Sequence, residues 1–295
     1  PAVVLAAAAA TPGLGDWSFD PPVVLVIVLG LLYLLGSRRT VTPRRTRTDQ
    51  RWRDACFYGS LVVLLLALSS PLDAYSEELF WAHMVQHVLL LVVAAPMMVL
   101  ARPWIRLWRA VPLSWRRWLA RGLSQGERTA PLRSLSRFLG SPVPAFVLFS
   151  GVLLAWHVPA MFDATLRSSE LHALEHSLFF ATAVMFWKQV IDSPPLHATL
   201  LAPERVVYVI GAMIVSWALA VVLALAPHAL YAHYAHEAVR PGGISAIADQ
   251  HVAAGIMWVP GSITFVIVIF AYVHRWLMPP APGSSTRAPR LASEH

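Results

Sequence analysis

The chain has 295 residues, of which 57% are hydrophobic and only 13% are charged. Soluble domains carry roughly twice that share of charged residues, so the composition excludes a disordered chain, a nucleic-acid-binding domain and an ordinary soluble enzyme. A single cysteine excludes a disulfide framework and a thiolate metal cluster. A chain this apolar is typical of a membrane protein. The question raised by its net charge of +7 is on which side of the membrane the basic residues lie.

Apolar runs of about 20 residues recur along the chain, and each is long enough to cross a bilayer. Backbone polar groups cannot stay unpaired in lipid, so each run predicts a helix. The expected fold is an all-α, integral membrane seven-helix bundle. Its spans are expected at Pro21–Gly36, Trp52–Ser69, Leu79–Ala101, Pro142–Ala160, Leu171–Ile191, Glu204–Ala226 and Gln250–Trp276. Pro96 and Pro260 fall inside the third and seventh spans and are expected to kink them.

Basic residues concentrate on alternate connections between these spans. The connections after the first, third and fifth spans hold seven, nine and two of them, and the tail holds three, which makes 21 of the 23 in the chain. Cytoplasmic loops carry such an excess of arginine and lysine. We therefore expect an extracytoplasmic amino terminus and a cytoplasmic carboxyl terminus.

Three segments outside the spans have their own character. Residues 1–20 are expected to form an extracytoplasmic segment, for which a processed signal peptide is the alternative. The cytoplasmic loop 102–141 interleaves arginines with tryptophans, a pattern typical of contact with anionic lipid, and docking of a partner subunit is the alternative. Residues 277–295 are expected to be a disordered cytoplasmic tail after the membrane domain 21–276.

Histidines are distributed unevenly between the two predicted sides. Nine of the twelve lie on the outer side: His83, His87, His157, His172, His176, His228, His233, His236 and His251. HMVQH begins the third span and HALEH begins the fifth. In each motif the two rings are four residues apart and share one helix face, about 6 Å apart along the axis.

This spacing allows one helix to provide two ligands to one metal ion. Because the spans alternate in direction, the end of the fourth span and the start of the seventh lie at the same level. The expected metal ligands are His83, His87, His157, His172, His176, Asp249 and His251. Gln86, Asp163, Glu175 and Asp73 are expected to orient the rings as hydrogen-bond partners. Taken singly, each histidine has the alternative of a hydrogen-bonded packing residue.

The loop LYAHYAHEAVRPGG adds a group of less regularly spaced histidines. His228, His233 and His236 either capture metal ions or belong to a solvated loop. Met161, Met84 and Met257 are candidate thioether donors, although a methionine on a membrane helix is normally a packing residue. Imidazole with occasional thioether favours copper, with zinc as the alternative. Binding requires neutral imidazole and is expected to weaken below about pH 6.

Four segments together resemble the CtaG-type cytochrome c oxidase assembly factors, a family of polytopic bacterial membrane proteins. They are HMVQHVLLLVVAAPMMVLARP, WHVPAMFDATL, LHALEHSLFFATAVMFW and ISAIADQHVAAGIMWVPGS. The resemblance runs from about Trp17 to Arg275. It implies a multi-pass protein of the bacterial plasma membrane that is not an enzyme, supplies copper and has a haem–copper oxidase subunit as its partner.

The resemblance extends to individual residues of the motifs. The residues that match the family pattern are His83, Gln86, His87, His157, Asp163, His172, His176, Asp249 and Gln250. His251 and the pair His233 and His236 are additions to that pattern.

Two other functions remain compatible with the sequence. The first is an electron carrier in which one histidine from the third span and one from the fifth are axial ligands to haem. The second is a zinc-dependent intramembrane hydrolase in which Asp249, Asp163 or Glu175 is the general base. A plain transporter is weaker, because the first, second and sixth spans carry no charged relay near mid-depth.

Overall fold

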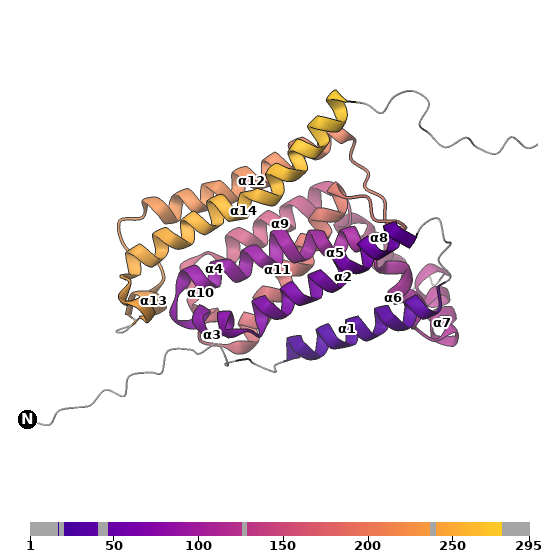
Figure 1. Cartoon of the computed structure of the whole chain (residues 1–295), viewed down its shortest axis with the longest axis horizontal. Helices are drawn as coiled ribbons and strands as arrows, with labels where there is room; N and C mark the ends of the chain where they lie inside the picture. The colour runs from indigo at the N-terminus through magenta and orange to yellow at the C-terminus, as the bar shows by residue number, and fades with distance from the viewer. Residues whose placement is uncertain (1–16, 18–20, 41–46, 126–128, 237–239, 279–295) are drawn as a thin grey trace, which may run out of the picture.

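Helices dominate the computed structural model, which describes residues 17, 21–40, 47–125, 129–236 and 240–278. These ranges contain no β-strand, so the all-α prediction is confirmed for them. Long helices run side by side along the long axis of the molecule (Figure 1). They are α1 (Pro21–Arg38), α2 (Arg47–Leu68), α4 (Phe80–Val88) with α5 (Ala95–Ala101), α9 (Pro142–Trp156), α11 (Ser169–Val190), α12 (Ala202–Leu225) and α14 (Ala246–Leu277).

A helix therefore occupies each of the seven ranges expected from the sequence. Three of them, Phe80–Ala101, Ala202–Leu225 and Ala246–Leu277, are long and apolar enough to cross a membrane. The number rises to five if two bent pairs each count as one span: α2 with α3 (Pro71–Glu78), and α8 (Ala130–Leu139) with α9. These helices are those of a multi-pass membrane protein, while the count of seven spans and the orientation of the termini stay predictions.

Short helices gather at the two ends of the bundle. One end holds α3, the start of α4, α10 (Pro159–Thr165) and α13 (Ala232–His236), and the opposite end holds α6 (Trp104–Ala110), α7 (Leu113–Gln125) and α8 (Figure 1). The first end corresponds to the predicted outer side and the second to the arginine-rich side. Residues 1–16, 18–20 and 279–295, most of the two predicted terminal segments, lie outside the described residues.

Tight packing in the centre joins α4 and α5 to α2, α11 and α14. Between α4 and α5 lies a π-helical segment, Leu89–Ala94, which begins two residues after His87. A kink is expected at Pro96 and at Pro260. Before Pro96 the helix contains this π segment, whereas α14 is one helix with Pro260 inside it. Pro96 has no N–H and cannot pair with the carbonyl groups four and five residues earlier, those of Val92 and Leu91.

Side chains of neighbouring helices pair with these carbonyl groups. Trp187 Nε1 of α11 donates to the Leu91 carbonyl at 2.7 Å, and Thr264 Oγ1 of α14 donates to that of Val92 at 2.6 Å. The Ala94 carbonyl accepts from Ser60 Oγ of α2 at 2.8 Å. An apolar environment tolerates a broken helical ladder only where other groups restore the hydrogen bonds. The π segment therefore fixes three helices around α4.

We expect Thr264→Val to lower the free energy of unfolding by about 1 kcal/mol, because it leaves the Val92 carbonyl without its donor at nearly unchanged side-chain volume. Denaturation of the detergent-solubilised chain measures the change. Thr182→Val is the matched control, since the Thr182 hydroxyl donates only to carbonyl groups of its own helix, those of Leu178 and Phe179. Equal losses in the two variants would contradict the role assigned to Thr264.

The orientation predicted from the arginines can be tested with two exposed histidines. In a Cys56→Ser background, which removes the only thiol, we expect His228→Cys to react with a membrane-impermeant maleimide in intact cells. His197→Cys should react only after the membrane is opened, because Lys188 and Arg205 assign its connection to the cytoplasm. The reverse pattern would refute the predicted orientation.

Candidate metal centre

His83 and His87 of α4 form one wall of a buried cluster at the end of the bundle that holds α3, α10 and α13. They are at positions i and i+4, so their rings project from one face of the helix, with 4.5 Å between centroids. Their exposed fractions are 0% and 2%. Apolar positions on either side, such as Phe80, Met84 and Leu91, are buried as well, so this face of α4 points into the bundle.

Glu175 and His176 of α11 form the opposite wall. The ligand atoms of His83, His87, Glu175 and His176 all lie within 4.8 Å of one another. The two Nε2 atoms of α4 are 3.0 Å apart, and the Glu175 oxygens lie 3.6 Å from His83 Nε2 and 3.5 Å from His87 Nε2. Two ligands of one tetrahedral ion, each about 2.0–2.1 Å from it, are separated by roughly 3.3 Å. The observed spacing matches that value.

Several polar atoms of the cluster have no hydrogen-bond partner within the described ranges. They are both carboxylate oxygens of Glu175, Nδ1 of His87 and Nε2 of His172 and His176. Glu175 is completely buried, and its distances to the two rings are too long for hydrogen bonds. An unpaired carboxylate in a low-dielectric interior costs several kcal/mol. A cation bound between the carboxylate and the rings removes that cost.

Two further histidines border the cluster. The His172 ring lies 5.1 Å from that of His83 and 4.2 Å from that of His176, between centroids. The His157 ring, at the end of α9, lies 5.7 Å from that of His87. His157 Nδ1 donates to the Leu153 carbonyl at 2.7 Å, and its Nε2 lies 3.3 Å from Met84 Sδ. Five imidazoles from three helices therefore meet in one region.

Asp249 and Asp163 have other partners. The Asp249 carboxylate accepts the backbone N–H groups of Phe80 and Trp81, both at 2.9 Å, and so caps the start of α4 from the first turn of α14. Asp163 accepts those of Ala232 and His233, both at 3.2 Å, at the start of α13. Asp249 thus orients α4, which carries part of the cluster, whereas Asp163 orients α13, and neither carboxylate belongs to the group of close ligand atoms.

The two glutamines of the motifs also link elements. Gln86 Nε2 donates to the Ala67 carbonyl at 2.7 Å and to Asp73 Oδ1 at 2.8 Å. Gln250 accepts from the Leu230 N–H at 2.8 Å and donates to the Leu223 carbonyl at 2.9 Å. The four residues expected to orient rings thus divide: Gln86, Asp73 and Asp163 orient helices, whereas Glu175 lies among the nitrogen atoms.

The loop histidines lie outside the cluster. His228 and His236 are exposed, as is His251 on α14. His233 is partly buried, and its Nε2 lies 3.0 Å from the Glu77 carbonyl oxygen. Met161 is also exposed, with an exposed fraction of 43%.

Two tyrosines of the same loop segment are buried instead. Tyr234 Oη donates to the Ser76 carbonyl at 2.5 Å and lies 3.4 Å from His83 Nδ1. Tyr231 Oη donates to the His157 carbonyl at 3.1 Å. The sequence motifs did not indicate these two tyrosines. Tyr231 and Tyr234 are three residues apart, and so are His233 and His236, but the two pairs are shifted by two residues along the chain. This shift could have distinguished the buried tyrosines from the more exposed histidines.

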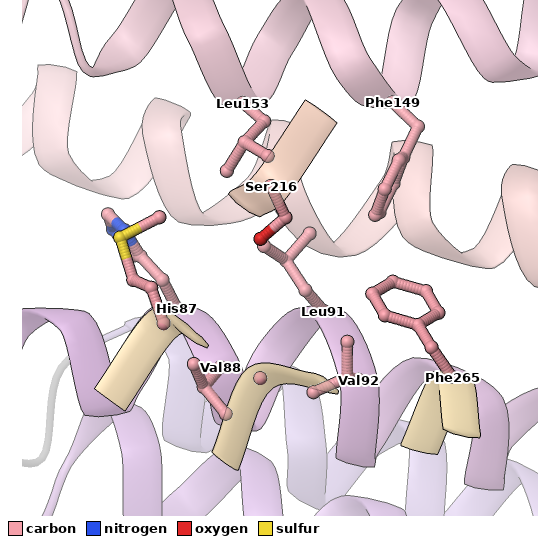
Figure 2. Close-up of a pocket in the computed structure, with 10 residues that line it drawn as sticks. His87, Val88, Leu91, Val92, Phe149, Leu153, Ser216 and Phe265 are labelled. Atoms are coloured by element: carbon pink, nitrogen blue, oxygen red, sulfur yellow. The ribbon is translucent and has the colours of Figure 1, made fainter. Parts of the chain in front are cut away.

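A small cavity of about 30 Å³ adjoins the cluster. Figure 2 shows His87 at one side of it, with apolar side chains such as Leu91, Leu153 and Phe265 around the remainder. Met257 also lines it. This volume holds one or two water molecules or an ion, and the largely apolar lining keeps bulk water away from the cluster.

The fold and the site define a helical, membrane-type protein with a buried histidine–carboxylate cluster near one end. The chain belongs to the cytochrome c oxidase caa3 assembly factor family (Caa3_CtaG), whose model matches residues 31–278. This match confirms the resemblance found in the motifs.

Mycobacterial proteins are among its relatives. The uncharacterized protein ML1998 of Mycobacterium leprae (strain TN) is 25% identical over 274 residues, which cover 88% of this chain and 39% of that protein. The uncharacterized protein Mb0105 of Mycobacterium bovis is 25% identical over 267 residues, with the same two coverages. The chain thus spans 39% of the length of these curated relatives. No solved structure matches it significantly.

The capping role of Asp249 leads to a prediction that a ligand role would not share. We expect Asp249→Asn to lower the free energy of unfolding by about 1 kcal/mol, because the amide can accept only one of the two N–H groups of α4. The metal stoichiometry of the purified chain should stay unchanged. Loss of one bound ion per chain without a loss of stability would instead identify Asp249 as a ligand.

Proposed function

We propose that this chain is a copper-binding assembly factor that holds copper between α4 and α11 and passes it to a subunit of a cytochrome c oxidase. The spacing of 3.0–3.6 Å among the ligand atoms of His83, His87 and Glu175 is the observation that carries this proposal. His176 completes a set of three imidazoles and one carboxylate.

The chemistry of the donors favours copper among the divalent ions. Imidazole nitrogen binds copper more strongly than it binds zinc, and calcium or magnesium would require more oxygen ligands. A cytochrome c oxidase is a haem–copper enzyme, so a factor needed for its assembly has a reason to bind copper. Zinc occupies the same kind of donor set, and metal analysis distinguishes the two ions.

Transfer requires that the ion leave without passing through free solution. His172 and His157 lie at the border of the cluster and supply further imidazoles. An ion can therefore exchange one ligand at a time, with each step replacing one nitrogen by another. His172 is partly exposed near the start of α11, which makes this side the exit for the ion.

Haem fits the same residues less well. Haem would take one axial ligand from α4 and one from α11, but the Glu175 carboxylate already lies among the nitrogen atoms of these two helices, with the ligand atoms of His83, His87, Glu175 and His176 all within 4.8 Å of one another. The adjoining cavity, of about 30 Å³, has room for an ion and water rather than for a porphyrin.

We expect Glu175→Gln to lower the copper affinity of the purified chain by about 100-fold, because the amide removes the negative charge and replaces an anionic ligand at constant volume. Copper bound per chain after dialysis against a competing chelator gives the affinity. Glu170→Gln, an exposed carboxylate of the same helix, is the matched control and should bind as the unmodified chain does.

Histidine substitutions extend the same test. His176→Ala should lower copper binding as Glu175→Gln does, whereas His251→Ala, at an exposed histidine, should leave it unchanged. Copper retained by a variant lacking His83, His87, Glu175 and His176 would refute the proposal. If the purified chain bound one equivalent of zinc and no copper, zinc would be the ion held by this cluster.

A further inference from the structure

Beside the four-residue cluster, His157 and Met84 form a contact that hydrogen bonding does not explain. His157 Nε2 lies 3.3 Å from Met84 Sδ. Both side chains are buried, with exposed fractions of 5% and 0%. They come from the end of α9 and the first half of α4, so the contact joins two helices at the same depth as the cluster.

The proton on His157 is located by its other nitrogen. Nδ1 lies 2.7 Å from the Leu153 carbonyl oxygen, which can only accept, so the hydrogen bond places a hydrogen on Nδ1. In the neutral ring, Nε2 then carries a lone pair. A thioether sulfur has no hydrogen to donate. Two electron-pair donors therefore face each other in a buried position, which is the arrangement of two ligands of one ion.

We propose that His157 and Met84 form a Cu(I) position that is separate from the cluster of His83, His87, Glu175 and His176. Thioether sulfur is a soft ligand that selects Cu(I), whereas a carboxylate with imidazoles suits a divalent ion. Bond lengths of about 2.0 Å to nitrogen and 2.3 Å to sulfur place two neighbouring ligands of a bent site roughly 3.3–3.5 Å apart. The observed distance of 3.3 Å agrees with that geometry.

The surroundings suit a reduced ion. Leu153 and Met257 line the small cavity next to His87, so a second thioether borders the same region. The His87 ring lies 5.7 Å from that of His157, and its buried Nδ1 has no hydrogen-bond partner among the described residues. His87 therefore lies beside both positions, and no transfer of copper between them is part of the inference. Copper enters and leaves this position as Cu(I), so no electron transfer is involved. The inference rests on the proposed function for its choice of copper.

The test uses the full chain in a Cys56→Ser background, so that no thiol competes for Cu(I). Under anaerobic conditions, competition with a chromogenic Cu(I) chelator gives the affinity, and X-ray absorption at the copper edge detects sulfur bonded to copper. We expect Met84→Leu, which keeps volume and hydrophobicity, to abolish the sulfur contribution and to lower Cu(I) affinity at least about tenfold. Zinc binding by the cluster should change less than about twofold.

Met98→Leu is the matched control, because Met98 is a buried methionine of α5 in a different hydrophobic cluster from Met84, the cluster that contains Cys56 and Leu64. It should keep both the sulfur contribution and the affinity. Sulfur bonded to copper in Met84→Leu, equal losses in the two variants, or Cu(I) bound by nitrogen alone in the parent chain would overturn the inference.

Failure of this inference is distinguishable from failure of the proposed function. If Glu175→Gln loses divalent copper while Met84→Leu has no effect on Cu(I), the cluster stands and the His157–Met84 position does not. If Met84→Leu removes the Cu(I)–sulfur contribution while Glu175→Gln has no effect on divalent copper, the His157–Met84 position is supported and the cluster is not a copper site.

Discussion

The buried carboxylate of Glu175 is the group on which the arrangement of this protein depends. It lies in a bundle whose interior is otherwise largely apolar and faces imidazole nitrogens from another helix at distances longer than hydrogen bonds. A charge in such a position is stable only with a counter-charge at close range. The metal ion that we propose meets this requirement, and side chains of α4 and α11 that face each other would supply its ligands.

The helices that hold these ligands are themselves positioned by polar contacts across the bundle. Asp249 caps α4 from α14, and Trp187 and Thr264 pair with carbonyl groups that the π segment and Pro96 leave free. All of these contacts lie within a few turns of His83 and His87. π segments often occur at functional sites, and this one terminates the turn of helix that carries the ligands. The hydrogen bonds from neighbouring helices offset the free-energy cost of the irregular helix. They also fix the orientation of the two imidazoles.

The copper transfer that we propose is compatible with a rigid fold, because different residues would serve the two roles. Capping carboxylates and buried tyrosines hold the backbone, while Nδ1 of His87 and Nε2 of His172 and His176 have no hydrogen-bond partner among the described residues. In the proposed function, nitrogen ligands at short intervals allow stepwise exchange, and a thioether beside them adds a ligand that suits the softer valence of copper. Membership of a cytochrome c oxidase assembly factor family is consistent with such a division of roles.

Much of the fold could be predicted from the sequence, because hydrophobic runs of bilayer length have few structural solutions. The positions of the long helices, their all-α character and the pairing of His83 with His87 and of His172 with His176 follow from local periodicity. The family follows from motifs that are contiguous in the chain. The sequence of one helix, however, does not show which residues face it from another helix. The position of Glu175 among the nitrogen atoms of His83 and His87 could therefore not be deduced from its place beside His176.

Tertiary structure decided which polar residues meet. Asp249 and Asp163 occur in motifs with histidines, yet their carboxylates bind backbone N–H groups, because each lies opposite the start of another helix. His251, His233 and His236 are on the same predicted side as the buried histidines, yet they lie outside the cluster. The sequence by itself determined the helices and the side of the bundle on which imidazoles concentrate, since these depend on local hydrophobicity and spacing. The ligand set and the contact between His157 and Met84 depend on the rotation of packed helices about their axes, which only contacts distant in the chain can set.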